Sequence, residues 1–294
     1  MSPLRLGIST CPNDTFAFQA LLAGRVEPEH GGDLDLEVEL LDVEELNQGM
    51  AVGRFDVAKM SFAQMLARAD ELVLLPAGSA LGFGVGPVVL ARPGFDPDAS
   101  RAEAHPDGPR VLCPGAGTTA HLLWRLFHPE PARVGQVVFH EIMPALARGE
   151  ADLGVCIHEG RFTWQDSDLS LVEDLGRRWE EDTGCPLPLG GIAARRDLAG
   201  PLRRRLARAI RRSIELGHAA RAGEAGPEAA DELVATMARH AQDPCAEVLW
   251  AHVDLYVNPW TLDLGEAGAR AIGVLSERAR AVGFAPAELR IEDA

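Results

Sequence analysis

Short apolar runs alternate, over roughly the first 200 residues, with longer stretches in which apolar residues recur at helical spacing. The apolar runs predict strands at Leu4–Ser9, Leu34–Leu40, Phe55–Lys59, Arg110–Cys113, Gln136–His140 and Asp152–Ile157. The periodic stretches predict helices at Asn13–Ala23, Asp42–Val52, Ser61–Ala69 and Thr118–Phe127, with Pro144–Arg148 inside a further helix. Alternating strands and helices are typical of an α/β fold in which helices cover a mostly parallel sheet.

The rest of the chain has a helical pattern. It predicts helices at Pro201–Ala220, Pro227–His240, Ala246–Val257 and Gly265–Val282. Two of the earlier helix starts have capping-box spacing, in which the first polar side chain and a Glu or Gln three residues later bond each other's backbone. Asp42 with Glu45 forms one such pair, and Ser61 with Gln64 forms the other.

Two Gly- and Pro-bearing extended segments interrupt the alternation, Gly84–Arg92 and Pro186–Arg195. We interpret them as two connections between two lobes, although both are also compatible with ordinary strands of a single sheet. The first interpretation divides the chain into a large discontinuous lobe, residues 1–91 and 188–294, and a smaller inserted lobe, residues 92–187. A ligand cleft is expected between the lobes.

A weak internal repeat supports two similar lobes. Residues 53–61 and 149–158 share a glycine, an aspartate three positions later, a short apolar strand and then a polar residue. The aspartates are Asp56 and Asp152, and the polar residues are Ser61 and His158. Because ligands of open α/β sheets bind beyond the carboxyl ends of the strands, Ser61 and His158 are expected at one shared site.

The composition fits a folded protein of two domains. The chain has 294 residues, of which 47% are hydrophobic and 24% charged, and domains hold roughly 150 residues each. A net charge of −16 repels nucleic-acid phosphates and anionic membranes. The basic run between Arg203 and Arg212 is interpreted as a solvated helix face. We therefore expect neither a nucleic-acid nor a membrane partner, and a homodimer stays open.

The location is expected to be the cytoplasm. No run of about 18 apolar residues occurs, and Met1 to Thr10 lacks the apolar stretch of a signal peptide. The five cysteines are scattered and include no C-x-x-C pair, which argues against a disulfide framework or a zinc site. Cys11 and Cys156 are interpreted as packing residues.

Three strand-to-helix turns have the composition of anion sites. They are the turn around Asn13 and Asp14, the turn at Lys59–Ser61, and the glycine-rich turn that leads into Thr118 and Thr119. Helix N-termini offer unpaired amides and a partial positive charge, so they attract carboxylates and phosphates. Each turn alone is as well explained by a simple N-cap. The glycine-rich turn matches neither a Walker A nor a dinucleotide fingerprint, so we expect no nucleotide site.

Lys59 and His158 are the main candidates for chemistry. Lys59 is the only lysine in the chain, whereas the other 27 basic residues are arginines, which suggests a role for a compact ammonium. His158 ends an apolar strand, and an imidazole suits proton transfer near neutral pH. Glu159 is placed to orient it. A chance lysine and a structural histidine are the alternatives.

Several longer sequence segments resemble those of a known family. They are STCPNDTF at 9–16, KMS at 59–61, SALGFGVGP at 79–87, PGAGTTA at 114–120, EIMPALARGE at 141–150, IHEGRFT at 157–163 and WAHVDLYVN at 250–258. In order and spacing they resemble the 1,4-dihydroxy-6-naphthoate synthase family of the futalosine route to menaquinone. The resemblance extends from residue 5 to about residue 283.

The resemblance implies a two-lobed α/β fold like that of type 2 periplasmic binding proteins, with mixed sheets and two connecting strands. It implies cleavage of cyclic de-hypoxanthinyl futalosine to 1,4-dihydroxy-6-naphthoate and a three-carbon fragment, without metal or cofactor. Residues matching the family's motifs would be His158 as proton acceptor and, as substrate contacts, Lys59, Met60, Ser61, Thr118, Thr119 and Ala120, to which the first turn adds Asn13 and Asp14.

Two other functions stay open at this stage. One is a non-catalytic binding protein for a small carboxylate. The absence of a recognisable signal peptide and the histidine at a strand end both argue against it. The other is the sister enzyme of the same pathway, a dehydratase acting on chorismate, which has a similar fold.

Overall fold

A computed structural model describes residues 3–96, 107–158, 160–241, 243–284 and 288–293. The chain divides into two compact units. The first unit joins Met1–Gly82 to Pro188–Ala294, and the second unit is Phe83–Leu187. The chain thus passes between the units twice, after Gly82 and after Leu187, and the first passage comes before the boundary at residue 91 expected from sequence.

The first unit contains a mixed sheet with the strand order β12-β4-β11-β3-β1-β2, in which β5 also pairs with β11. Its strands are β1 (Leu4–Ser9), β2 (Leu36–Leu41), β3 (Val57–Ser61), β4 (Leu72–Leu74), β5 (Ala80–Gly82), β11 (Leu187–Arg195) and β12 (Arg290–Ile291). Strand β1 runs parallel to β2 and β3, whereas β11 runs antiparallel to β3 and β4. The parallel part that the alternating pattern predicts is therefore one side of the sheet, β3-β1-β2, and β11 joins it to the rest in the antiparallel direction.

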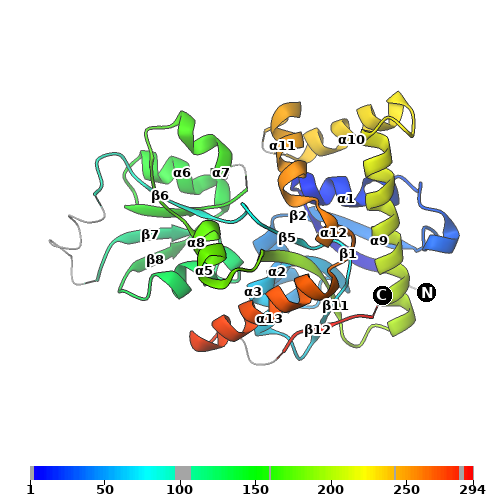
Figure 1. The fold of residues 1–294 in the computed structure, drawn as a ribbon, viewed down its shortest axis with the longest axis horizontal. Coiled ribbons are helices and arrows are strands. Elements are labelled where there is room, and N and C mark those ends of the chain that lie inside the picture. The colour runs from blue at the N-terminus through cyan, green and yellow to red at the C-terminus, as the bar shows by residue number, and fades with distance from the viewer. Residues whose placement is uncertain (1–2, 97–106, 159, 242, 285–287, 294) are drawn as a thin grey trace. The chain divides into compact units, whose positions relative to one another are not determined.

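Helices cover both faces of this sheet (Figure 1). One face packs against α1 (Pro12–Leu22), α9 (Gly200–Arg221), α10 (Pro227–His240) and α11 (Ala246–Tyr256). The other lies against α2 (Val43–Ala51), α3 (Phe62–Ala67) and α13 (Gly265–Ala281). Short helices are η1 (Pro28–His30) and α12 (Pro259–Leu262). Leu6, Ile8 and Phe16 are fully buried in the core on the first face, and their burial contributes to its hydrophobic stabilisation.

The second unit contains a five-stranded sheet with the order β10-β6-β9-β7-β8. Its strands are β6 (Val88–Ala91), β7 (Arg110–Cys113), β8 (Arg133–Gln136), β9 (Leu153–Cys156) and β10 (Ser170–Asp174). Its helices are α5 (Thr119–Phe127), α6 (Phe139–Ala147), α7 (Gly160–Thr163), η2 (Trp164–Asp166) and α8 (Leu175–Thr183). Val88, Leu90 and Ile142 belong to the core between this sheet and α6.

Several sequence predictions are confirmed. Strands β1 and β7 and helix α10 have the predicted bounds. Helices α11 and α13 end one residue before the predicted end, and α9 extends one residue beyond the prediction at both ends. The capping box at the start of α2 is present, with Asp42 accepting from the Glu44 amide and Glu45 accepting from the Asp42 amide.

Two local predictions are wrong. The strand expected at Gln136–His140 is instead β8, which ends at Gln136, and His140 lies in the first turn of α6. Val138 is extended and begins that helix, because its carbonyl accepts the Glu141 amide. The predicted Ser61–Gln64 capping box does not form, since Ser61 makes no side-chain cap to α3.

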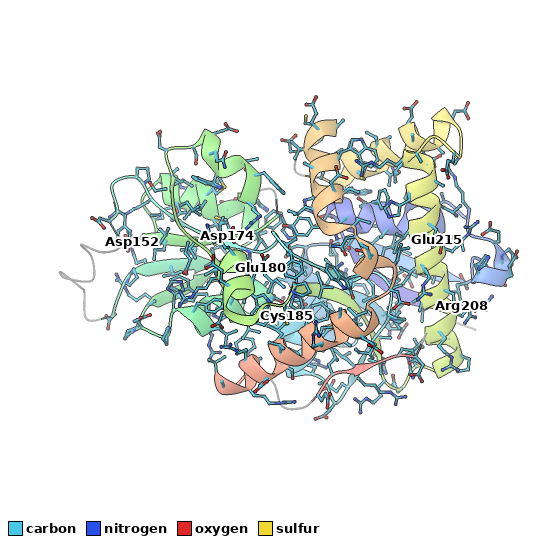
Figure 2. The ribbon with its side chains drawn as sticks, viewed as in Figure 1. Asp152, Asp174, Glu180, Cys185, Arg208 and Glu215 are labelled. Atoms are coloured by element: carbon cyan, nitrogen blue, oxygen red, sulfur yellow. The ribbon has the colours of Figure 1, made fainter. Side chains whose placement is uncertain are left out.

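The basic run on α9 is only partly a solvated face. Arg208 is exposed on α9, as is Glu215 two helical turns further on (Figure 2). Arg203, in contrast, is buried and paired with the buried Glu292 next to β12. The interpretation of the whole run as solvated is therefore wrong at Arg203. No helix among the described residues is long and apolar enough to cross a membrane.

Candidate functional site

Each unit holds the start of one of its strands by the same arrangement, an arginine bonded to an aspartate and to a glycine carbonyl. In the first unit, the backbone and side chain of Arg5 on β1 both donate to Asp56, and Arg5 Nη1 donates to Gly53 O over 3.0 Å. In the second unit, the backbone and side chain of Arg110 on β7 donate to Asp152, and Arg110 Nη2 donates to Gly149 O over 3.0 Å. The internal repeat predicted an aspartate in each turn; the arginine partners come from the neighbouring parallel strands.

The two aspartates are held as carboxylates. The hydrogen bond from Arg5 lowers the pKa of Asp56. Burial opposes the ionisation of Asp152, but donation by Arg110 and Arg92 outweighs it and lowers the pKa to about 2. Each ion pair sets the start of the strand that follows, β3 in the first unit and β9 in the second. Two of the candidate groups, the Ser61 hydroxyl and the His158 imidazole, lie at or just beyond the other ends of those strands.

Lys59 on β3 lies in a buried polar network of the first unit. Its Nζ donates to Asp14 Oδ1 over 2.6 Å and to Gly78 O over 3.1 Å, and the lysine retains only 5% of its exposed area. Asp14 also accepts from Ser9 Oγ and from Asn13 Nδ2, over 2.5 and 2.8 Å. Three donors thus surround one buried carboxyl. The network therefore holds an ammonium and a carboxylate together at the start of α1.

His252 on α11 belongs to the same network, although the sequence analysis assigned it no role. Its Nε2 lies 3.0 Å from Asn13 Oδ1, and the histidine is 1% exposed. Because Asn13 donates to Asp14 through its amide nitrogen, its oxygen accepts, so His252 carries a proton on Nε2. No local signal could have found this pair, since the two residues are 239 positions apart.

Ser61 at the end of β3 is held by Asn47 on α2. Its Oγ accepts from Asn47 Nδ2 over 3.3 Å, and its amide donates to Asn47 Oδ1 over 3.0 Å. This exchange explains why Ser61 does not cap α3. In this exchange the Ser61 oxygen acts as the acceptor, so the hydroxyl proton is not used in the bond to Asn47. Met60, between Lys59 and Ser61, points to the opposite face of the strand and is fully buried.

The glycine-rich turn of the second unit is closed by Thr118, the N-cap of α5. Its hydroxyl donates to Gly115 O over 2.7 Å and accepts from the His121 amide. Thr119 and Ala120 follow in the first turn and are buried. The turn thus presents the N-terminus of a nine-residue helix, and the Thr118 hydroxyl serves to hold that turn together.

His158 follows β9 by two residues and has an unusual backbone. Its φ is 54°, and it is the single residue other than glycine with positive φ among those the structure describes. Such a conformation is disfavoured for L-residues and is often found at functional sites. The imidazole packs edge-on against Phe139 of α6 with the ring centres 4.7 Å apart. Glu159, its suggested orienting partner, lies outside the described residues.

Two thiols lie at the ends of β7 and β9, ahead of the Thr118 turn and of His158. Burial raises the pKa of Cys113 and of Cys156 to about 12. Both stay protonated at neutral pH, which agrees with Cys156 as a packing residue. Across the described part of the chain, no three His, Cys, Asp or Glu side chains gather in a way that could hold a metal ion.

The fold defines the general class of protein. The periplasmic aliphatic sulphonate binding protein from Escherichia coli superposes with a TM-score of 0.62 at 12% identity, covering 98% of this chain and 90% of its own. A protein of solved structure from Archaeoglobus fulgidus superposes with a TM-score of 0.80 at 30% identity, covering 96% of this chain and 98% of its own. The chain has the fold of periplasmic binding proteins, as expected.

Sequence comparison gives the family. A family model described as "Menaquinone biosynthesis" matches residues 4–281, and the chain belongs to this family. It is 45% identical over 97% of both chains to a Thermus thermophilus protein named 1,4-dihydroxy-6-naphtoate synthase. A Streptomyces coelicolor protein of the same name is 43% identical, over 97% of this chain and 95% of its own.

Proposed function

We propose that this protein is a 1,4-dihydroxy-6-naphthoate synthase, a lyase that converts cyclic de-hypoxanthinyl futalosine to 1,4-dihydroxy-6-naphthoate and a three-carbon fragment. The observation that carries the proposal is the 45% identity, over nearly the full length, to a protein of that name. The chemistry of the described side chains is compatible with it, because the reaction needs a base, donors for a developing oxyanion and a site for a carboxylate.

His158 is the proposed base. Opening and aromatising the substrate ring requires removal of a proton from carbon, and an imidazole is suited to this near neutral pH. The turn after β9 holds His158 in the left-handed conformation, and its ring packs against Phe139. An imidazole fixed in this way is prepared for proton transfer before the substrate arrives.

The donors come from the end of β3. Lys59 has three N–H groups, and the network accounts for two of them, through Asp14 and Gly78. The Ser61 hydroxyl can still donate its proton in a hydrogen bond, because in the bond with Asn47 its oxygen is the acceptor. We assign the remaining N–H of Lys59 and the Ser61 hydroxyl to the substrate, where fixed donors stabilise developing negative charge. Met60 would take part through its backbone.

The carboxylate of the substrate is assigned to the N-terminus of α5, where Thr118 closes the turn and Thr119 and Ala120 supply the first amides. A helix N-terminus binds a carboxylate without a metal. The proposed steps use only side chains and backbone groups of this chain. We propose that the reaction takes place in the cytoplasm.

Incubation of the pure protein with cyclic de-hypoxanthinyl futalosine tests the proposal directly. We expect 1,4-dihydroxy-6-naphthoate to accumulate, as measured by chromatography with mass detection. Tight binding of the substrate without turnover would instead identify a binding protein. Consumption of chorismate in a parallel reaction would identify the sister dehydratase.

Replacing His158 tests its role as base. We predict that His158→Asn folds normally and binds the product, but loses at least about a hundredfold in turnover, the scale of a missing general base. Asparagine is chosen because it tolerates positive φ better than alanine does. The matched control is His140→Asn on the exposed side of α6, which should keep full activity. A His158→Asn rate equal to that of the wild type would remove His158 from the mechanism.

A further inference from the structure

The segment that carries His158 is short, and two backbone hydrogen bonds close its turn. The Gly160 amide donates to Ile157 O and the Arg161 amide to His158 O, both over 3.2 Å. Helix α7, which follows, is a single turn. A left-handed residue between two such elements needs support from the surrounding structure to keep its conformation. In addition to the contact of His158 with Phe139, a side chain of this segment ties it to the rest of the unit.

That side chain is Arg161. Its guanidinium donates twice to Asp174, Nη1 to Oδ1 over 3.1 Å and Nη2 to Oδ2 over 2.7 Å. Nη1 also donates to Gly86 O over 3.0 Å. The side chain is only 14% exposed, so water screens these bonds less than it screens a surface pair. A planar guanidinium that holds a carboxylate in two bonds has a fixed orientation as well as a fixed position.

The partners of Arg161 are themselves firmly held. Asp174 is the N-cap of α8 and accepts the Arg177 amide, and Figure 2 shows it beside α8 together with Glu180. Glu180 accepts the Gly84 amide over 2.6 Å, and the Leu175 amide donates to Pro87 O over 3.0 Å. Residues 84–87 are thus fastened to α8 at both ends.

The contact between residues 84–87 and the start of α8 leaves no room for a side chain at Gly86 or Gly176. A Cβ on Gly176 would lie 1.8 Å from Val85 O, and one on Gly86 would lie 2.6 Å from Leu187. Gly86 also has a φ of +116°, a conformation that other residues rarely adopt. Residues 84–87 and the start of α8 therefore form a rigid anchor, which follows the point where the chain enters this unit and touches Leu187, the last residue of the unit.

We propose that Arg161 is a positioning residue that fixes the His158 turn to this anchor, so that the imidazole keeps the orientation needed for proton abstraction. The inference rests on the proposed function of His158 as base. Arg161 acts through His158 and is not assigned a contact with the substrate. Glycine at 86 and 176 and the carboxylate at 174 serve the same purpose by keeping the anchor rigid.

A test by spectroscopy needs no substrate. The edge-on contact with Phe139 gives the His158 ring protons a ring-current shift, which a carbon–proton correlation spectrum detects and His158→Asn assigns. In Arg161→Gln this shift should collapse toward the value of a free histidine. In the control Arg177→Gln, whose side chain pairs with Glu181 on the exposed face of α8, the shift should not change. An unaltered shift in Arg161→Gln overturns the proposal, whatever the enzyme's activity.

Kinetics give a second, independent test. Arg161→Gln should lower kcat by about ten- to a hundredfold, the effect of a small displacement of a catalytic group, with product affinity within about twofold of the wild type. Arg161→Lys should retain part of the rate. In a His158→Asn background, Arg161→Gln should have no further effect, because it acts through the missing imidazole. An equal loss in both backgrounds would mean a structural role and would overturn the proposal, whereas a wild type without turnover would refute the proposed function instead.

Discussion

Lys59 is surrounded by groups that fit an ammonium and leave little room for anything larger. Its Nζ bonds to Asp14 and Gly78, and its Cε lies 3.5 Å from the position of a Cβ on Gly190. This explains why a chain that otherwise uses only arginine as its basic residue keeps one lysine. A guanidinium is longer and planar, and it cannot occupy the same space with the same two bonds.

We therefore predict that Lys59→Arg lowers turnover by about tenfold or more and lowers the melting temperature, although the charge is unchanged. Steady-state kinetics and thermal unfolding measure the two effects. The reverse swap on the surface, Arg54→Lys, is the control, because Arg54 pairs with Glu39 in solvent. If Lys59→Arg melted and turned over like the wild type, the fit around the ammonium would not matter.

At this scale the sequence predicts chemistry better than it predicts contacts. The single lysine and the histidine at a strand end were both visible as unusual residues. The bond between His252 and Asn13 was not visible, because it joins α11 to α1 across most of the chain. The use of the Ser61 hydroxyl by Asn47 was hidden for the same reason, since it depends on how α2 packs on β3.

Among the elements, β9 depends on a charged contact at its start. Asp152 bonds to Arg110 and Arg92, and its pKa in the folded protein is about 2, below the usual value of 3.8. A carboxyl whose pKa is lowered by folding stabilises the folded state at pH values above its unfolded pKa. That contribution is lost as the pH falls from about 4 to about 2.

Asp152→Asn should therefore lower the free energy of unfolding at pH 7 by roughly 1 kcal/mol, a modest figure because solvent partly screens the pair. The difference from the wild type should shrink as the pH falls from about 4 to about 2. Urea unfolding at a series of pH values measures it. Asp168→Asn, an exposed site in the same unit, should show no such trend, and a constant difference for Asp152→Asn would contradict the ion-pair explanation.

Helices whose first residues form a recognisable start in the sequence were predicted well. The capping box at Asp42 and the proline at the start of α10 define those helices from neighbouring residues alone. Strands such as β4, β5 and β10 were missed, because they are short and are defined by pairing with distant strands. The strand expected at Gln136–His140 failed because an apolar stretch of this length fits a strand or a helix start equally well.

For the whole molecule, the C-terminal segment closes the sheet of the first unit. Strand β12 pairs with β4, and Glu292 beside it is 4% exposed and bonds to Arg203 and Arg204. Arg203 also donates to the backbone carbonyl of Arg196. The two ends of the sequence therefore belong to one sheet, while the middle of the chain forms a separate unit.

Glu292→Gln should destabilise the protein by about 3–5 kcal/mol, because it leaves a buried guanidinium without its charged partner. Urea unfolding gives the loss, and hydrogen exchange at β12 should accelerate. Asp33→Asn removes the partner of the exposed Arg205 and should cost far less. Equal stability of the two variants would show that the C-terminal segment contributes little to the first unit.

The overall architecture was accessible from the sequence because it follows from alternation and from two interrupting segments. The exact place where the chain passes between the units was less accessible. Residues 83–91 read as one extended stretch, but β6 pairs with β9 and β10, and that pairing assigns them to the second unit.

The beginning of β3 is held by Arg5, Gly53 and Asp56, and the beginning of β9 is held in the same way by Arg110, Gly149 and Asp152. The strands differ at their other ends, where β3 finishes with the hydroxyl of Ser61 and β9 leads to the imidazole of His158. Protein engineers can therefore exchange the reactive groups at these two positions while the arginine–aspartate pairs keep the strands in place.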